Sequence, residues 1–126
     1  MDFSKEIETL QAELIADVTA LCLYHIKGLA QSEADRLTGI YNLVAAGECS
    51  WYDYARFVIA RAEALCVPLK ATVGQINPIT TSEFPLPAPR PENSRLSTAR
   101  LRESFGLHLP HWQVHVTRLL DELIGP

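Results

Sequence analysis

The sequence lacks a glycine-rich loop, a long apolar run and a basic cluster, and each absence excludes a class of function. Its 6 glycines stand singly, so no Gly-x-Gly-x-x-Gly string can bring backbone amides against a pyrophosphate at a helix start. No apolar run reaches the roughly 18 residues that a membrane-spanning helix needs, so we expect no membrane span. The net charge is -4 and the basic residues are scattered, which argues against nucleic-acid binding.

Cysteine is also scarce. Cys22, Cys49 and Cys66 are odd in number, widely spaced and without a Cys-x-x-Cys pair, so we predict reduced, mostly buried thiols and neither a disulfide framework nor a thiolate metal site. The N-terminus is acidic and polar where a secretory signal is basic and then apolar, so we expect a cytoplasmic protein. With 126 residues, 48% hydrophobic and 21% charged, the chain is typical of a single globular domain, residues 1–126.

Apolar residues recur at helical spacing between residues 7 and 29, where they form two rows. The rows are Ile7, Leu10, Leu14, Val18 and Leu21, and Ile15, Cys22, Ile26 and Leu29. Two rows are wider than the roughly 100° stripe of a surface helix. We therefore predict a helix that needs neighbours on two sides, and a second copy of the chain is the simplest candidate for the uncovered side.

Shorter patterns predict both helices and strands further along. Residues 40–45 are a β-branched and aromatic run between glycines, and residues 69–73 alternate apolar with polar side chains; both are typical of strands. Ser50 suits an N-cap, with Asp53 at the acidic position of a capping box, so a helix should start after it. We predict an α/β, helix-rich fold with about four helices and a few short strands.

The C-terminal quarter carries two further helix signals. Ser97 suits the cap of a short helix from Thr98 to about Ser104, and Gly106 suits its end. Pro110 fits the first turn of a last helix. The buried row of that helix is predicted to be Trp112, Val116, Leu119, Leu120 and Leu123.

Prolines at alternate positions dominate residues 84–92. Pro85, Pro87, Pro89 and Pro91 remove backbone donors and disfavour helix, so the segment should be extended and polyproline-like. Taken alone it could be a ligand for an SH3-type domain. Its place between two patterned segments favours an ordered loop that runs across the surface.

Several motifs occur in an order that resembles a known family. They are Ala12-Glu-Leu-Ile-Ala-Asp-Val-Thr-Ala, Gly39-Ile-Tyr-Asn-Leu-Val-Ala-Ala-Gly, Ser50-Trp-Tyr-Asp-Tyr-Ala-Arg, and Arg90-Pro-x-Asn-Ser-Arg-Leu followed by Leu-Pro-x-Trp. Over residues 11–124 the chain resembles the C-terminal, substrate-binding part of the dTDP-4-dehydrorhamnose reductases. These are extended short-chain dehydrogenases of dTDP-rhamnose biosynthesis. The resemblance implies that a Rossmann half, which binds NADPH, should precede residue 11.

The family reaction uses a tyrosine general acid with a lysine four residues later. The tyrosines of this chain are followed at that spacing by Gly28, Ala45, Arg56 and Val58. We therefore predict no catalytic residues, no NADPH site and no reduction of a keto-sugar by this chain alone.

The Arg-Pro-x-Asn-Ser-Arg string supplies the candidate substrate-binding residues. The resemblance implies that Arg90, Asn93 and Arg95 line a nucleotide-sugar cleft, where arginines suit bidentate contact with a pyrophosphate. The alternative is structural: both arginines pair with local carboxylates such as Glu83 and Glu92, and Asn93 satisfies backbone groups at a turn.

Trp51 is the fourth candidate substrate-binding residue. A tryptophan in the first turn of a helix can line a sugar or base site, although one on an apolar helix face is more often core. Trp112 is assigned to packing.

The sequence contains two candidate metal sites. His111 and His115 have the spacing of a zinc pair, but tryptophan stands where a metalloprotease needs glutamate, so we interpret the histidines, with His108, as a surface group. Some relatives form a homodimer around magnesium, and Glu13 and Glu122 occupy matching contexts. Magnesium prefers oxygen ligands; the alternative is two solvated glutamates.

The resemblance implies a truncated dTDP-4-dehydrorhamnose reductase-like protein, inactive alone, that binds a dTDP-sugar weakly or forms one part of a split reductase. The alternative is a non-enzymatic interaction or regulatory subunit that docks a partner through the uncovered face of the helix at residues 7–29. The expected partners are a second copy in a homodimer or a separate Rossmann-domain chain.

Overall fold

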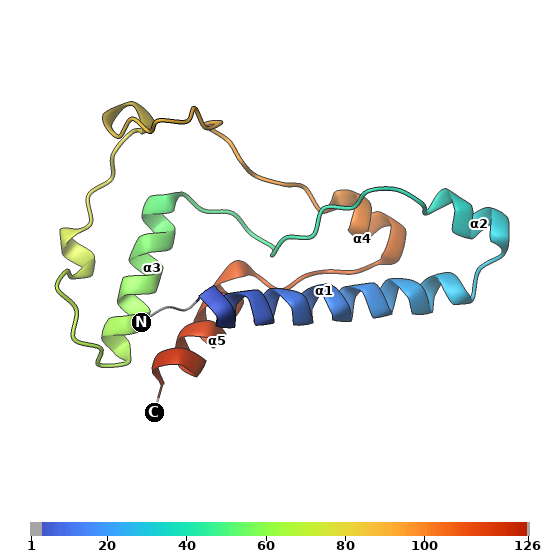
Figure 1. Ribbon diagram of the computed structural model, residues 1–126, viewed down its shortest axis with the longest axis horizontal. Coiled ribbons are helices and arrows are strands. Elements are labelled where there is room, and N and C mark those ends of the chain that lie inside the picture. Colours follow the sequence, from blue (N-terminus) through green and yellow to red (C-terminus); the bar gives the residue numbers. More distant parts are fainter. Residues whose placement is uncertain (1–3, 126) are drawn as a thin grey trace. The chain divides into compact units, whose positions relative to one another are not determined.

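The fold is helix-rich (Figure 1). The computed structural model describes the backbone of residues 4–125 and the side chains of residues 14–125. Its α-helices are α1 (Ser4–Lys27), α2 (Gln31–Arg36), α3 (Trp51–Ala64), α4 (Ala99–Phe105) and α5 (Trp112–Ile124), and its 3₁₀-helices are η1 (Val73–Gln75) and η2 (Thr81–Glu83). The β pairing within residues 4–125 is limited to a parallel bridge between Ala46 and His111. The predicted strands at 40–45 and 69–73 are therefore wrong, and α2 was not predicted.

The described chain divides into two compact units, each built from two separate stretches. The first joins the described residues up to Val44 with Leu96–His108, and the second joins Ala45–Arg95 with the described residues from Leu109 onward. The single domain over 1–126 stays a prediction. None of the helices in the described part of the chain is long and apolar enough to cross a membrane.

Helix α1 confirms the predicted helix, but its pattern of burial differs from the prediction. Its half-buried residues are Leu14, Val18, Cys22 and Ile26, and Leu29, two residues beyond its end, is half-buried too. Its exposed large apolar residues are Ile15, Leu21, Leu23 and Tyr24. The half-buried row takes members from both predicted rows, so the described neighbours cover one face of α1 and not two. The side chains of Ile7 and Leu10 lie outside the described residues.

In the first unit, Arg100 of α4 holds the segment that was predicted as a strand. Its guanidinium donates to the carbonyl of Ile40 at 3.0 Å and to that of Thr38 at 3.2 Å, and it lies 4.6 Å from the ring centroid of Tyr41. Gly39 has φ of 150°, and a Cβ there would overlap this guanidinium. The carbonyls of Thr38 and Ile40 are thus satisfied by a side chain and not by a neighbouring strand.

The segment 69–73 also loses its strand to side-chain partners. The Val73 N–H donates to Glu63 at 3.2 Å, and the Thr72 N–H donates to Gln75 at 2.9 Å, which opens η1. Alternation of apolar and polar residues predicts a strand only where a neighbouring strand accepts these donors. The proline-rich residues 84–92 carry no helix or strand and are exposed, in agreement with the predicted loop.

In the second unit, α3 packs on α5 through aromatic side chains. The ring of Trp112 lies 5.7 Å from that of Tyr54 and 5.1 Å from that of Phe57, so the assignment of Trp112 to packing is confirmed. The predicted N-cap is confirmed too, since Ser50 Oγ accepts from the Asp53 N–H at 3.0 Å. The predicted row of α5 is half-buried throughout: Trp112, Val116, Leu119, Leu120 and Leu123.

Helix α5 starts later than predicted. Pro110 lies outside the helix because its carbonyl accepts from the Ala46 N–H at 2.9 Å, while the Trp112 N–H donates to the Ala46 carbonyl at 2.9 Å. His111 is the N-cap, and its Nδ1 accepts from the Gln113 N–H at 3.3 Å. This bridge joins the start of α5 to the segment that leads into α3.

Helices α3 and α4 both end at a residue with left-handed backbone conformation. Gly106 ends α4 at φ of 64°, as predicted. At the end of α3 the left-handed residue is Cys66, at φ of 60°; its N–H bonds the Glu63 carbonyl at 2.9 Å, and the Val67 N–H bonds the Ala62 carbonyl at 3.1 Å. These two bonds form a Schellman motif, in which glycine is the usual residue at that position.

Candidate functional site

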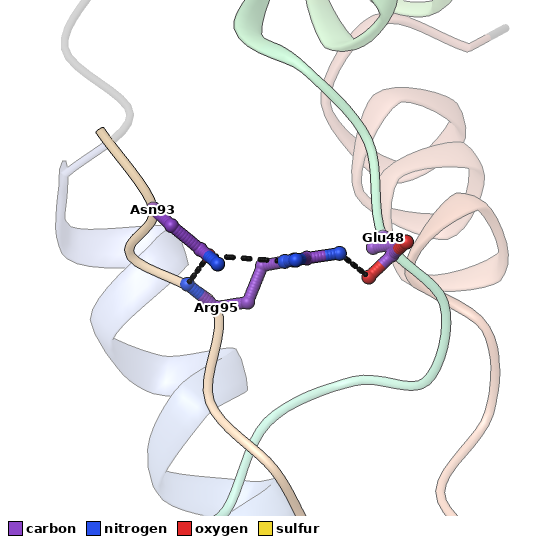
Figure 2. Close-up of polar contacts among 3 residues, drawn as sticks. All are labelled: Glu48, Asn93 and Arg95. Atoms are coloured by element: carbon purple, nitrogen blue, oxygen red, sulfur yellow. Dashed lines mark hydrogen bonds and ion pairs between the residues drawn. The ribbon is translucent and has the colours of Figure 1, made fainter.

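Asn93, Arg95 and Glu48 form the polar cluster that lies at the predicted substrate-binding string (Figure 2). Asn93 Oδ1 accepts from the backbone N–H of Arg95 at 3.1 Å and from its Nε at 3.0 Å. The far end of the guanidinium, Nη1, donates to Glu48 Oε2 at 2.6 Å. Figure 2 shows the Arg95 side chain extending from its own segment to the segment that carries Glu48. All three residues belong to the second unit.

Arg95 is held in place from its own side of the cluster. The Asn93 amide oxygen bonds both the main chain and the side chain of Arg95, an Asx-type turn that fixes the direction of the guanidinium. The Arg95 and Glu48 side chains are 60% and 64% exposed. An ion pair this exposed stabilises the fold by about 0.2–1 kcal/mol. It is therefore easily opened, while the Asn93 anchor remains.

Arg90 lies on the same exposed segment and is not drawn into this cluster. Within the described residues it forms no hydrogen bond or ion pair, and neither arginine pairs with Glu83 or Glu92. The predicted local partners are thus wrong for Arg95, whose carboxylate partner comes from far away in the sequence. Glu83 instead accepts from the N–H of Thr80 and caps η2.

Trp51 is the first residue of α3 and is 83% exposed, so its assignment to the core is wrong. Its ring and the ring of Tyr54 form a T-shaped pair with centroids 5.9 Å apart. It stands three residues after Glu48. The Glu48–Arg95 ion pair therefore connects the Arg90–Arg95 segment to the segment that leads into α3, the helix that carries Trp51.

Gly47 determines how Glu48 is presented. It has φ of 81°, in the region that favours glycine, and a Cβ at this position would overlap the imidazole of His111. The neighbouring Ala46 bonds the start of α5 through both its N–H and its carbonyl. The segment carrying Glu48 is thus fixed by a close backbone approach that only glycine allows.

The histidines do not form the metal pair that their spacing would allow. His111 is the N-cap of α5, with its Nδ1 on Gln113, and His108 is exposed. His115 is half-buried, and its Nε2 is shielded without a described partner, so the interpretation as a surface group is wrong for this residue. Among the described residues there is no group of three side chains that could hold a metal ion.

Glu122, the other candidate metal ligand, accepts from Arg118 Nε at 2.8 Å one helical turn away. The side chain of Glu13 lies outside the described residues. The described residues alone do not fit a magnesium site, because Glu122 belongs to no group of three ligating side chains among them.

The cysteines are free thiols. Cys22 is half-buried, but Cys49 and Cys66 are exposed, so the prediction of mostly buried thiols is wrong. Burial raises the pKa of the Cys22 thiol. Burial and the charge of Asp53 raise the pKa of Cys49, which disfavours the nucleophilic thiolate.

Sequence reasoning missed an open groove between α3 and α5. It has a volume of about 680 Å³ and is lined by Phe57 and by α5 side chains from Gln113 to Glu122. Val114, in this lining, is a large apolar residue that lies exposed. Three other lining residues form ion pairs, Asp121 with Arg61 and Arg118 with Glu122.

Comparison with known proteins identifies the family. The family model of the RmlD substrate binding domain matches residues 11–124. The chain belongs to this family. The dTDP-4-dehydrorhamnose reductase of Escherichia coli (strain K12) is 44% identical over 112 residues, which are 89% of this chain and 35% of the relative. The enzyme of the same name from Burkholderia thailandensis is 37% identical over 115 residues, 90% of this chain and 38% of the relative. The chain thus spans little more than a third of the length of these relatives.

Proposed function

We propose that this chain provides the nucleotide-sugar-binding surface of a dTDP-4-dehydrorhamnose reductase, and that the Arg90–Arg95 segment contacts the diphosphate of a dTDP-sugar. The observation that carries the proposal is the orientation of Arg95 by Asn93 on an exposed segment, within the region matched by the substrate-binding family. A guanidinium that is anchored at Nε offers its remaining N–H groups to phosphate oxygens at small entropic cost.

Arg90 and Trp51 complete the proposed surface. Arg90 is a second exposed cation without a described partner, and two cations suit the spread charge of a diphosphate. The exposed indole of Trp51 offers a flat apolar face for the sugar or the thymine. In this proposal these residues belong to one wall of a nucleotide-sugar cleft, as in an extended short-chain dehydrogenase.

We propose that the hydride donor is bound by other residues than those of this sequence. The sequence has no glycine-rich dinucleotide motif and no tyrosine with a lysine four residues later. NADPH would be held by a Rossmann domain, either a separate partner chain or an adjoining part of the same protein. This chain would then supply substrate binding but no catalytic group.

The test is calorimetric titration of the chain with dTDP-rhamnose, dTDP and NADPH. We expect both dTDP compounds to bind and NADPH not to bind. Arg95→Gln should weaken dTDP binding about tenfold, because a charged hydrogen bond to phosphate is worth roughly 1.5–3 kcal/mol. Arg102→Gln is the matched control, since Arg102 is an exposed arginine of α4 with the same charge. Equal effects of the two substitutions would contradict the proposal.

A second candidate function is supported by α1. Leu21 and Tyr24 are exposed and lie one helical turn apart, so they form an apolar patch on one face. We propose that this face docks a second copy of the chain. Leu21→Glu should lower the mass measured by light scattering. Leu23→Glu is the matched control and should not, because Leu23 is also exposed but lies on another face of α1. A mass unchanged by Leu21→Glu would exclude this surface.

Magnesium at such a dimer interface, held by Glu13 and Glu122, stays a prediction. It is checked by measuring the mass of the Glu122→Gln variant with magnesium and with EDTA. If magnesium and EDTA change the mass of the native chain and of Glu122→Gln equally, Glu122 is not a magnesium ligand.

A further inference from the structure

Glu48 places a negative charge on the guanidinium to which the proposed function assigns a diphosphate. Its Oε2 lies 2.6 Å from Arg95 Nη1 (Figure 2). Together with Glu92 it balances the two arginines of the segment, so the four side chains Glu48, Arg90, Glu92 and Arg95 sum to no net charge. Four charges that sum to zero attract an anion less strongly than the two arginines would by themselves.

Glu48 is not needed to position Arg95. Asn93 alone bonds the main-chain N–H and the Nε of Arg95, whereas Glu48 contacts the terminal nitrogen only. A carboxylate and a phosphate take the same guanidinium N–H groups in the same geometry. An arriving phosphate must therefore displace Glu48 or bind beside it, where like charges repel.

We propose that Glu48 sets the affinity of this site: its carboxylate competes within the chain for Arg95 and so determines how tightly the site holds an anion. The inference rests on the proposed function, because it takes Arg95 as the diphosphate-binding group. The occupant of the guanidinium is exchanged when ligand binds: the diphosphate takes the Nη1 donor, and the Glu48 carboxylate is released to water. Both side chains are mostly exposed, so this exchange needs no rearrangement of buried groups.

The size of the effect follows from the strength of an exposed ion pair. Competition by such a pair lowers the affinity of Arg95 for an anion up to about fivefold. Glu48→Gln keeps the shape of the side chain but removes the charge. It should therefore strengthen the binding of inorganic pyrophosphate by up to about fivefold.

The matched control is Glu92→Gln. Glu92 is exposed, belongs to the same segment and forms no ion pair with Arg95 in the described structure. Its removal changes the net charge of the chain by the same amount but leaves the competitor in place. It should strengthen pyrophosphate binding less than twofold.

The experiment is a titration of the whole chain with inorganic pyrophosphate, followed through the NMR signal of the Arg95 Nε–H. This signal reports on the site itself and remains readable when binding is weak. We expect tighter binding for Glu48→Gln than for both the native chain and Glu92→Gln. Variants with Arg95→Gln lack this signal and are titrated by calorimetry, where adding Glu48→Gln to Arg95→Gln should give no gain.

Two other outcomes overturn the inference in different ways. If pyrophosphate moves the Arg95 signal in the native chain but Glu48→Gln binds no more tightly than Glu92→Gln, Glu48 is not a competitor and the proposed function stands. If pyrophosphate moves the Arg95 signal neither in the native chain nor in Glu48→Gln, Arg95 is not part of an anion site and both proposals are wrong.

Discussion

Replacing Gly47 with alanine tests how the segment before α3 is built. The φ of 81° costs an alanine about 1–2 kcal/mol, because its Cβ approaches the following carbonyl. The new methyl group also overlaps the imidazole of His111. The ring cannot retreat with its backbone, since Ala46 bonds both Pro110 and Trp112 at 2.9 Å. Overpacking of this kind adds about 1–3 kcal/mol, so we expect Gly47→Ala to lower the free energy of unfolding by about 2–5 kcal/mol.

Gly106→Ala separates the two parts of that cost. Gly106 has φ of 64°, but a Cβ there meets no atom within 4 Å. Only the backbone term applies, so this substitution should cost about 1–2 kcal/mol. The double variant Gly47→Ala with His111→Ala provides the second control: without the ring, its cost relative to His111→Ala should fall to the same 1–2 kcal/mol or so.

Urea unfolding is the assay, followed by circular dichroism for helix content and by tryptophan fluorescence. Trp51 and Trp112 are the 2 tryptophans of the chain and both belong to the second unit, so fluorescence reports on the unit that contains Gly47. Gly106 belongs to the first unit and is monitored by circular dichroism. If Gly47→Ala costs no more than Gly106→Ala, the close contact with His111 is not a constraint and the reasoning is refuted.

Three further predictions concern single contacts. Cys66→Gly should stabilise the chain by about 1 kcal/mol relative to Cys66→Ala in urea unfolding, because Cys66 holds the left-handed position that ends α3. Hydrogen bonds from the Thr80 backbone and then from its hydroxyl lower the pKa of Glu83. The support that the ionised carboxylate gives η2 is therefore full above the ordinary glutamate pKa and is lost as pH falls through the lowered pKa. In an NMR titration of Thr80→Ala the pKa of Glu83 should rise partway towards its ordinary value, and an unchanged pKa would rule out a contribution from the hydroxyl. Asp121→Asn should cost less than about 1 kcal/mol, because its ion pair with Arg61 is partly exposed; a larger loss in urea unfolding would show that the pair carries more of the α3–α5 contact than its exposure allows.

The helices were predictable where the signal is local. Ser50 and Asp53 lie three residues apart, and the hydrogen bond between them forms within the segment that it caps. Gly106 ends α4 through its own backbone freedom. Such features depend on a few neighbouring residues, so the sequence contains the whole interaction.

The strands were not predictable, because a strand is completed by a distant partner. The pattern at 40–45 describes side chains that suit a sheet, yet what reaches this backbone is Arg100, some 60 residues later. The pattern at 69–73 fails for the same reason: the backbone N–H groups of Thr72 and Val73 donate to the side chains of Gln75 and Glu63 and not to a strand. β propensity records how well a residue fits a sheet that already exists.

The candidate site divides along the same line. The Asn93–Arg95 turn was foreseeable, since its bonds span two residues. Glu48 was not, because its bond to Arg95 spans 47 residues and nothing near Glu48 marks it as a partner. For Trp51 the sequence left two alternatives, a binding residue or a core residue. The structure leaves it 83% exposed at the first position of α3, and residue type alone could not show this exposure.

Substitutions at Arg95 should therefore change ligand affinity alone, whereas substitutions at Gly47 should change both affinity and stability. The Arg95 contacts are exposed and worth little to folding, so substitutions there should change affinity and leave the unfolding curve almost unchanged. Gly47 is joined through Ala46 and His111 to the start of α5, and it immediately precedes Glu48. A side chain at position 47 should thus weaken the second unit and move the carboxylate that competes for Arg95. The proposed site is set by local bonds on one segment and by the packing of the fold on the other.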